Sequence, residues 1–295
     1  MFTKVLFPTD FSTYANAVFD CLPELKVAGM REVVLLYVIR SIDVPLPESV
    51  NQESLERVRW SATELLNIAQ MALENQGLHV MTRIEYGSPA AEIVRVAEEE
   101  GAGLIFMGAQ GATLLRELLL GSVASEVVRR ATVPVLVQKF EVVRELGHMQ
   151  CRRVCEQLFA RVLHPTDFSP CAKAAFQVVK RLKAAGTQEV LVLHVRDERT
   201  MRRRPPGQVA AFEQKDRRRL DKLRRDLLLF GLQVRVLWRL GIPFHEVLKV
   251  AEEENPGLIV LGAWGHSAVS ELLVGSTLES VVRLSRYPVL VVRCK

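Results

Sequence analysis

Short apolar or alternating runs take turns with longer amphipathic segments along the whole chain. In the first half, the runs that predict strands span residues 4–9, 32–39, 79–86, 103–108 and 133–139. The segments with helical spacing of apolar residues span 13–29, 47–76, 88–101 and 122–131. This alternation of strands and helices predicts an α/β fold, with a parallel sheet covered by helices on both faces.

The same order of elements recurs in the second half of the chain. The sequence VLFPTDFS at Val5–Ser12 returns as VLHPTDFS at Val162–Ser169, and Gly103–Lys139 matches Gly257–Arg293. A near-constant offset over so long a stretch indicates a tandem duplication rather than a solenoid repeat. We therefore predict a first domain over residues 1–140, a linker helix over 141–158 and a second domain over 159–295.

Each copy carries a glycine pattern that begins where a strand ends and finishes where a helix begins. Its positions are Gly108, Gly111, Gly121 and Ser122 in the first copy, and Gly262, Gly265, Gly275 and Ser276 in the second. In an open parallel sheet, ligands bind beyond the carboxyl ends of the strands. Glycine lets the backbone approach a ligand, and unpaired N–H groups at a helix start bind anions. No lysine follows the last glycine as it does in a Walker loop.

A Pro-Thr-Asp sequence ends the first predicted strand of each copy, at Pro8–Asp10 and at Pro165–Asp167. These residues should lie on the same rim of the sheet as the glycines. A carboxylate there suits the hydroxyls or the amine of a nucleoside and repels phosphates. We expect the nucleoside near Asp10 and the phosphates near Gly121 and Ser122. The alternative is that the glycines are turn residues only, and duplication can also copy an inactive site.

In order and spacing, these motifs, followed by Pro-Val-Leu-Val at 134–137 and 288–291, resemble the universal stress protein family. The resemblance covers nearly the whole chain, and the glycine pattern is similar to that of the family's ATP-binding branch. It implies two tandem, open, five-stranded parallel sheets of strand order 3-2-1-4-5, in the Rossmann-like fold of the adenine nucleotide alpha hydrolases. It also implies ATP or AMP at the rim, with Mg²⁺ accompanying ATP.

The resemblance also implies a set of nucleotide contacts in each copy. In the first copy they are Pro8, Thr9, Asp10, Val38, Met107, Gly108, Gly111, Gly121, Ser122 and Val123. In the second copy they are Pro165, Thr166, Asp167, Val195, Leu261, Gly262, Gly265, Gly275, Ser276 and Thr277. Val38 and Val195 would meet adenine through backbone groups. The copies differ where Phe7 becomes His164, Gln110 becomes Trp264 and Val123 becomes Thr277. We expect packing changes at the first two pairs and unequal phosphate affinity from the third.

Members of this family pair through their last strand. Residues 133–139 and 287–293 would then pair with each other, so that one chain forms a pseudo-dimer and covers both edge strands. Assembly into a homodimer stays open, and the sequence does not name a protein partner.

The net charge of +5 is modest, and much of the positive charge lies between Arg202 and Arg225. Acidic residues and helically spaced leucines interrupt this stretch, which favours a solvated helix face over a nucleic-acid site. A location near the phosphates of the second site is a further hypothesis.

The cysteines Cys21, Cys151, Cys155, Cys171 and Cys294 are odd in number and form no dense framework, so we expect reduced thiols in a cytoplasmic protein. On a linker helix, Cys151 and Cys155 would share one face, and we expect apolar packing there rather than a metal site. We see no secretory leader and no apolar run long enough for a bilayer, so we expect no membrane contact.

Three functions fit the motifs. The first is a nucleotide-binding stress or signalling module that acts through conformation or partner binding. The alternative is a slow ATP hydrolase or phosphotransferase, although no residue has the spacing of a catalytic triad and none is an evident water-orienting group. The third is an interaction scaffold whose sites no longer bind nucleotide. We expect no catalytic residues and no dedicated metal site.

Overall fold

The computed structural model divides into two compact units, Met1–Arg152 and Arg153–Lys295. It describes residues 1–40, 52–110, 120–145, 148–153, 157–201, 206–263 and 276–294.

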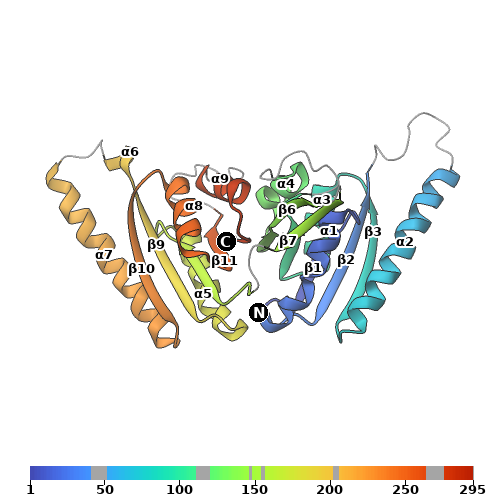
Figure 1. Ribbon diagram of the computed structural model, residues 1–295, viewed down its shortest axis with the longest axis horizontal. Helices are drawn as coiled ribbons and strands as arrows, with labels where there is room; N and C mark the ends of the chain where they lie inside the picture. Colours follow the sequence, from blue (N-terminus) through green and yellow to red (C-terminus); the bar gives the residue numbers. More distant parts are fainter. Residues whose placement is uncertain are drawn as a thin grey trace. The chain divides into compact units, whose positions relative to one another are not determined.

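The first unit is built on a parallel sheet whose strands lie in the order β3-β2-β1-β4-β5, and Figure 1 shows β1, β2 and β3 side by side. These strands are β1 (Lys4–Pro8), β2 (Glu32–Ile39), β3 (His79–Tyr86), β4 (Leu104–Gly108) and β5 (Val135–Gln138). The chain runs from β1 to β2 and β3 on one side, and then returns to β4 and β5 on the other. The topological switch point therefore lies between β1 and β4, and the strand order expected from the family resemblance is confirmed.

The helices of the first unit are α1 (Thr13–Phe19), the 3₁₀ helix η1 (Leu22–Ala28), α2 (Gln52–Glu74), α3 (Pro89–Glu99) and α4 (Ser122–Arg130). Helices α3 and α4 pack against each other, and α2 packs on β2 and β3. The single helix predicted over 13–29 is wrong. It ends at Phe19 and a 3₁₀ helix follows, because Pro23 has no N–H with which to continue the α-helical bonds.

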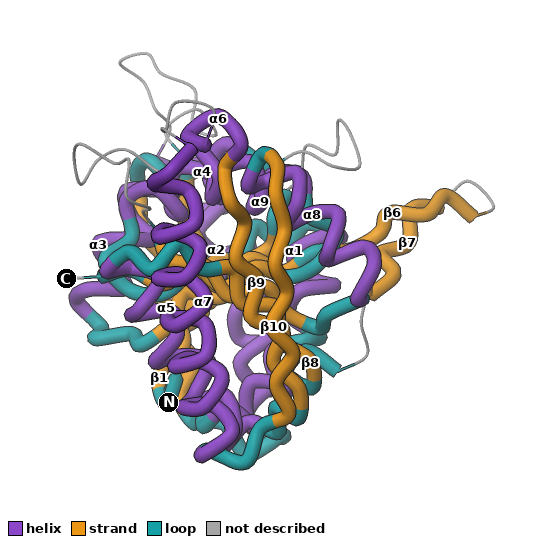
Figure 2. The backbone as a smooth tube through the Cα atoms, turned by 90° about the vertical axis from the view of Figure 1, so that its left-hand side faces the viewer, coloured by secondary structure: helices purple, strands orange, loops and turns teal. Residues whose placement is uncertain are grey.

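The second unit repeats this arrangement with strands in the order β10-β9-β8-β11-β12. These strands are β8 (Arg161–Pro165), β9 (Glu189–Asp197), β10 (Gln233–Gly241), β11 (Leu258–Gly262) and β12 (Val289–Val292). The helices are α5 (Pro170–Arg181), η3 (Leu182–Ala185), α6 (Glu198–Met201), α7 (Pro206–Leu229), α8 (Pro243–Glu254) and α9 (Ser276–Leu284). Strands β9 and β10 run side by side, and α7 packs against both (Figure 2).

The linker helix predicted over 141–158 is wrong. Strands β6 (Phe140–Glu145) and β7 (His148–Arg153) form a separate two-stranded sheet there. The physical reason is local, because the neighbouring β-branched residues Val142 and Val143 favour a strand over a helix. Cys151 therefore lies on a strand, and Cys155 lies outside the described residues.

The central strands are buried on both faces, as continuous apolar runs require. Val5, Leu6 and Phe7 of β1 are fully buried, and so are Val162 and Leu163 of β8. His164 occupies the position of Phe7 and is also fully buried, with its ring 5.9 Å from that of Phe176. The expected packing change is therefore confirmed. Burial lowers the pKa of His164 from 6.5 to about 4, and it outweighs the hydrogen bond to Val260 O and the charge of Asp167, which both raise it.

No helix among the described residues combines the length and the apolar character needed to cross a bilayer.

Candidate functional site

The Pro-Thr-Asp sequence of each copy forms a tight turn at the carboxyl end of the central strand. In the first copy, Thr9 Oγ1 accepts the Phe11 N–H at 3.0 Å, and Asp10 Oδ1 accepts the Ser12 N–H at 3.0 Å. Ser12 Oγ then caps α1 by accepting the Ala15 N–H at 3.2 Å, as expected for an N-cap serine. The threonine thus holds the turn together, while the Asp10 side chain stays exposed on the rim.

The second copy builds the same turn. Thr166 Oγ1 accepts the Phe168 N–H at 3.1 Å, and Asp167 Oδ1 accepts the Ser169 N–H at 2.9 Å. Ser169 Oγ accepts the Ala172 N–H at 3.2 Å and caps α5. The same three side-chain hydrogen bonds form in both copies, so the repeated Pro-Thr-Asp-Phe-Ser sequence forms the same local structure twice.

The phenylalanine after each aspartate adopts a left-handed backbone, with φ of 53° at Phe11 and 63° at Phe168. A left-handed residue other than glycine costs about 1–2 kcal/mol, so the surroundings must hold it. The ring of Phe11 stacks on Tyr37 of β2 with centroids 5.8 Å apart, and Phe168 packs on His194 of β9 at 4.8 Å. These contacts fix the turn against the neighbouring strand.

Val38 and Val195 lie just beyond the point where the central strand ends. Pro8, the last residue of β1, is in register with Leu36, and Leu36 O accepts the Thr9 N–H at 2.9 Å. Backbone groups two residues apart on a strand point to the same side, so Val38 directs its N–H and C=O to where β1 has ended. In the second copy, Leu193 O accepts the Thr166 N–H at 2.8 Å, which orients Val195 in the same way.

The glycine that ends each fourth strand is required by packing of the first helix. A Cβ atom on Gly108 would lie 2.8 Å from Tyr14 Cε1 of α1. On Gly262 it would lie 2.5 Å from the carbonyl carbon of Cys171 in α5. Both glycines therefore let the start of a helix sit directly on the strand end. Met107 and Leu261, one residue earlier, are buried side chains.

Phosphates are expected near Gly121 and Ser122 because of unpaired N–H groups at the helix start, but the N–H of Gly121 is not one of them. Its N–H donates to Ala109 O at 2.7 Å, which closes the base of the glycine-rich segment, and a Cβ would approach that oxygen to 3.3 Å. The α4 helix itself has no side-chain cap among the described residues, and its bonding begins with Ser125 N–H to Gly121 O at 2.9 Å. The donors at the helix start are thus the N–H groups of Ser122 and Val123.

The corresponding start of α9 is formed by Ser276, which is exposed, and Thr277, which is half-buried. Four residues singled out in the glycine pattern, Gly111, Trp264, Gly265 and Gly275, lie outside the described residues.

A side-chain cluster flanks the turn of the second copy. His194 donates from Nδ1 to Thr166 O at 2.8 Å, and its Nε2 lies 3.6 Å from Asp216 Oδ2 of α7. Arg219 of the same helix lies over the Phe168 ring, 5.1 Å from its centroid. Part of the arginine-rich stretch therefore packs beside the Asp167 turn.

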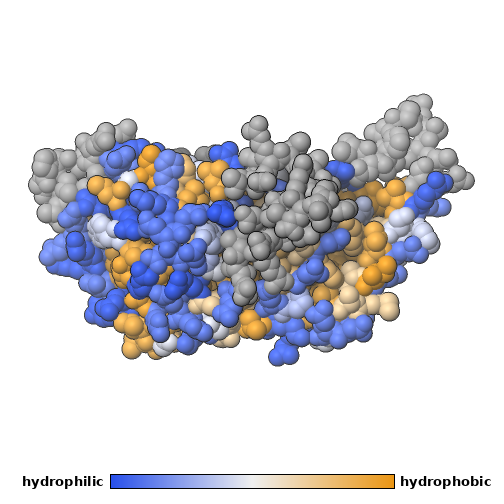
Figure 3. All heavy atoms as spheres, viewed as in Figure 1, coloured by the Kyte–Doolittle hydropathy of each residue, from blue (hydrophilic) through white to orange (hydrophobic). Residues whose placement is uncertain are grey.

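The rest of α7 includes the exposed residues Arg218, Arg224 and Arg225, and the surface over this helix is mainly hydrophilic (Figure 3). For these residues the expected solvated helix face is confirmed. Arg202, Arg203 and Arg204 lie outside the described residues.

The expectation of reduced thiols is wrong for one pair, because Cys171 and Cys294 form a disulfide. Cys21 is buried and takes part in no disulfide. The pairing had a signal in the sequence. When the copies are aligned, Cys171 falls on Tyr14 and Cys294 on Phe140, and those two rings touch with centroids 5.4 Å apart. The two positions that touch in the first copy are thus both cysteine in the second.

Within the described ranges, no group of His, Cys, Asp or Glu side chains is arranged to hold a metal ion. The rim has three parts in each copy, namely an exposed aspartate, outward backbone groups on the second strand, and the start of a helix. Two copies of an open, Rossmann-like α/β domain, each with a polar rim at its switch point, define the class of protein.

Comparison with known proteins names the family within this class. The model of the universal stress protein family matches residues 1–139 and 159–293, so the chain belongs to the universal stress protein family.

Relatives match one copy or both. Universal stress protein MJ0577 of Methanocaldococcus jannaschii is 32% identical over 157 residues, which cover 47% of this chain and 97% of that protein. Universal stress protein Mb2028c of Mycobacterium bovis is 25% identical over 282 residues, which cover 90% of this chain and 89% of that protein. The crystal structure of a universal stress protein from Archaeoglobus fulgidus has a TM-score of 0.75 and 27% identity, covering 99% of this chain and 98% of that one.

Proposed function

We propose that each copy binds an adenine nucleotide, ATP or AMP, with Mg²⁺ accompanying ATP. The protein would act as a stress-response or signalling module in the cytoplasm, where bound nucleotide changes its conformation or its partner binding. The observation that carries this proposal is the duplicated turn, which leaves Asp10 and Asp167 exposed at the carboxyl end of the central strand of each sheet.

The nucleoside would bind between this aspartate and the second strand. The Asp10 carboxylate accepts hydrogen bonds, which suits ribose hydroxyls, and Val38 offers one backbone donor and one acceptor to adenine. Asp167 and Val195 offer the same groups in the second copy.

The phosphates would lie at the start of the fourth helix of each copy. At α4, the N–H groups of Ser122 and Val123 and the exposed Ser122 hydroxyl supply donors at the positive end of the helix dipole. Ser276 and Thr277 begin α9 in the same way. Thr277 adds a hydroxyl where the first copy has Val123, so we expect unequal phosphate affinities.

We also propose that the last strands of the two copies, β5 and β12, pair with each other, because an uncovered edge exposes unpaired backbone groups. In residues 135–138 and 289–292, the N–H groups of Val135, Val137, Val289 and Val291 face away from β4 and β11. Protection of these four amides from hydrogen exchange in the full chain tests this pairing. Rapid exchange in both segments would contradict it.

The test of function is mass spectrometry of small molecules released from the purified protein, followed by calorimetric titration with ATP, AMP and, as a control, GTP. We expect an adenylate to be released or to bind, and GTP to bind more weakly. If no adenylate binds, the chain is a scaffold and the proposal fails. If Mg–ATP turns over and the Ser122→Ala/Ser276→Ala variant abolishes turnover, the protein is a hydrolase instead.

A further inference from the structure

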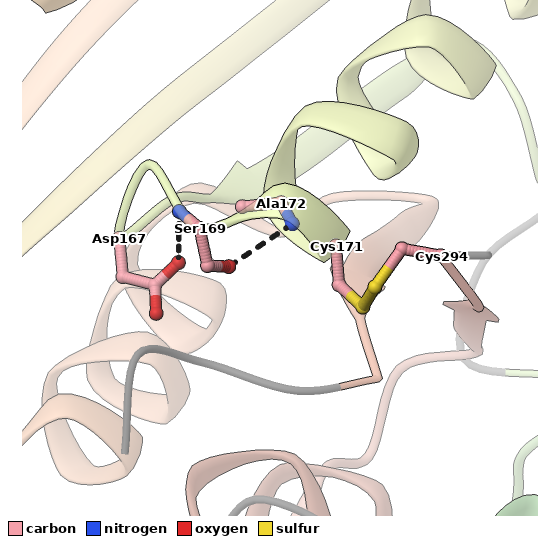
Figure 4. Close-up of a disulfide and its surroundings, with 5 residues drawn as sticks. All are labelled: Asp167, Ser169, Cys171, Ala172 and Cys294. Carbon is pink, nitrogen blue, oxygen red and sulfur yellow. Dashed lines mark hydrogen bonds between the residues drawn. A yellow bond between two sulfur atoms is a disulfide. The ribbon is translucent and has the colours of Figure 1, made fainter. Parts of the chain in front are cut away.

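The disulfide of the second copy lies beside the candidate rim (Figure 4). Cys171 is the second residue of α5, two residues after the capping Ser169, and Cys294 follows the end of β12. Their Cα atoms are 4.7 Å apart, although 123 positions separate them in the sequence. The bond therefore ties the carboxyl end of the last strand to the first turn of α5.

This first turn is continuous with the Asp167 turn. Ser169 N–H donates to Asp167 Oδ1 at 2.9 Å, and Ser169 Oγ accepts the Ala172 N–H at 3.2 Å. Figure 4 shows both bonds and the disulfide at the same end of α5, where the helix begins. Any shift of Cys171 therefore moves the segment that presents the Asp167 carboxylate.

The other end of the bond is tied to the start of the glycine-rich segment. Gly262 of β11 is in register with Val292 of β12, and Val292 O accepts the Ala263 N–H at 2.8 Å. Gly262 also lies against the backbone of Cys171, since a Cβ there would come within 2.5 Å of the Cys171 carbonyl carbon. The disulfide thus clamps α5 onto the strand ends from which both parts of the rim extend.

The first copy has no such clamp. The aligned positions hold Tyr14 and Phe140, whose rings meet edge to face at 5.4 Å. An aromatic contact of this kind does not respond to a reductant. At these aligned positions, only the second copy carries a group that a reductant changes. The first copy therefore serves as an internal control for the effect of reduction.

We propose that the Cys171–Cys294 disulfide is a redox switch that sets the nucleotide affinity of the second copy. The inference rests on the proposed function. The oxidised bond holds the Asp167 turn against the end of β11, which favours binding because less ordering is needed. Reduction releases α5 from β12 and weakens binding at the second site alone.

The reaction is thiol–disulfide exchange with a cellular dithiol. Its thiolate attacks the sulfur of Cys294, because Cys294 is partly exposed whereas Cys171 is only 1% exposed. The S–S bond breaks, and Cys171 leaves as a thiolate that the positive end of α5 stabilises. The second thiol of the reductant then displaces Cys294. Two electrons and two protons pass to the protein, which gains two thiols, and the dithiol becomes a disulfide.

The test is calorimetric titration of the full chain with Mg–ATP before and after treatment with dithiothreitol, with the thiol state checked by alkylation and mass spectrometry. The Asp10→Ala variant isolates the second site, and Asp167→Ala isolates the first. We expect reduction to weaken the second site about tenfold, within the usual range of coupling between sites, and to leave the first within about twofold. The Cys171→Tyr/Cys294→Phe variant, which copies the first domain, should bind without a redox response.

Each outcome decides the proposal. If both sites bind Mg–ATP and reduction changes the second site by less than twofold, the switch is refuted while the proposed function stands. If neither site binds in either state, the proposed function fails. Amide hydrogen exchange then tests separately whether the disulfide controls the Asp167 turn. Faster exchange of residues 165–172 after reduction supports a redox-controlled turn, and unchanged exchange refutes it.

Discussion

The rings of Tyr14 and Phe140 meet edge to face in the first copy, and the aligned positions of the second copy, Cys171 and Cys294, are joined by a disulfide. The same two places in one fold are thus held by an aromatic contact in one copy and by a covalent bond in the other. Because only this pair in the second copy is joined by a bond that a reductant breaks, a reductant can change the stability of the second copy without changing that of the first.

The Cys294→Ser variant should lower the free energy of unfolding of the second copy by about 2–5 kcal/mol, because a long loop of the unfolded chain is no longer closed. Denaturant unfolding with and without reductant measures the change. Reductant should have no further effect on this variant. The Cys21→Ala variant, which removes a buried thiol outside the disulfide, should keep the full response to reductant. If the Cys21→Ala variant no longer responded to reductant, the assignment of that response to the Cys171–Cys294 disulfide would be contradicted.

The Asp10→Ala variant should weaken nucleotide binding at the first site about tenfold or more, because a charged hydrogen-bond acceptor is lost. Asp10→Asn should bind better than Asp10→Ala, since its amide oxygen still accepts the Ser12 N–H and keeps the turn. Calorimetry with ATP compares the variants, and Asp20→Ala, an exposed carboxylate beyond α1, is the control. Equal affinity in all three variants would exclude Asp10 from the site.

Gly262→Ala should destabilise the protein by about 1–3 kcal/mol, as expected for an overpacked position, and more than Gly108→Ala does. The added Cβ meets the backbone of Cys171 in the first case and the ring of Tyr14 in the second, and a ring adjusts more readily than backbone. Thermal or denaturant unfolding measures both changes. Gly103→Ala is the control, because a Cβ there meets no atom closer than 3.7 Å. A larger loss of stability in Gly108→Ala than in Gly262→Ala would refute this packing argument.

His164 should make the second copy sensitive to acid. Burial lowers the pKa of His164 from 6.5 to about 4, so between these values the unfolded chain binds a proton that the folded chain does not. The free energy of unfolding of the second copy therefore keeps its full value above pH 6.5. It falls as the pH drops toward 4, by about 3 kcal/mol in total.

Unfolding of the His164→Phe variant, which restores the residue of the first copy, tests this prediction. The variant should lose less stability than the parent chain between pH 6.5 and 4. His79→Gln changes an exposed histidine and should behave like the parent. Identical acid sensitivity of the parent and His164→Phe would show that other groups are responsible.

The sequence by itself determined the duplication, the α/β class and the bounds of several elements, because these depend on local patterns. Residues 32–39 and 79–86 have the strand lengths that the apolar pattern predicts, and Ser12 caps α1 as its position before the helix requires. The strand order followed from the family resemblance carried by the repeated motifs.

Only the tertiary structure decided how the residues of the rim are used. Thr9 holds its own turn, Gly108 makes room for Tyr14, and Gly121 gives its N–H to Ala109. It also brought Cys171 to Cys294, across almost the whole length of the second copy. A sequence pattern records which side chains are apolar or small, whereas the partner of each group depends on strands and helices far apart in the chain. Those partners exist only once the sheet has formed.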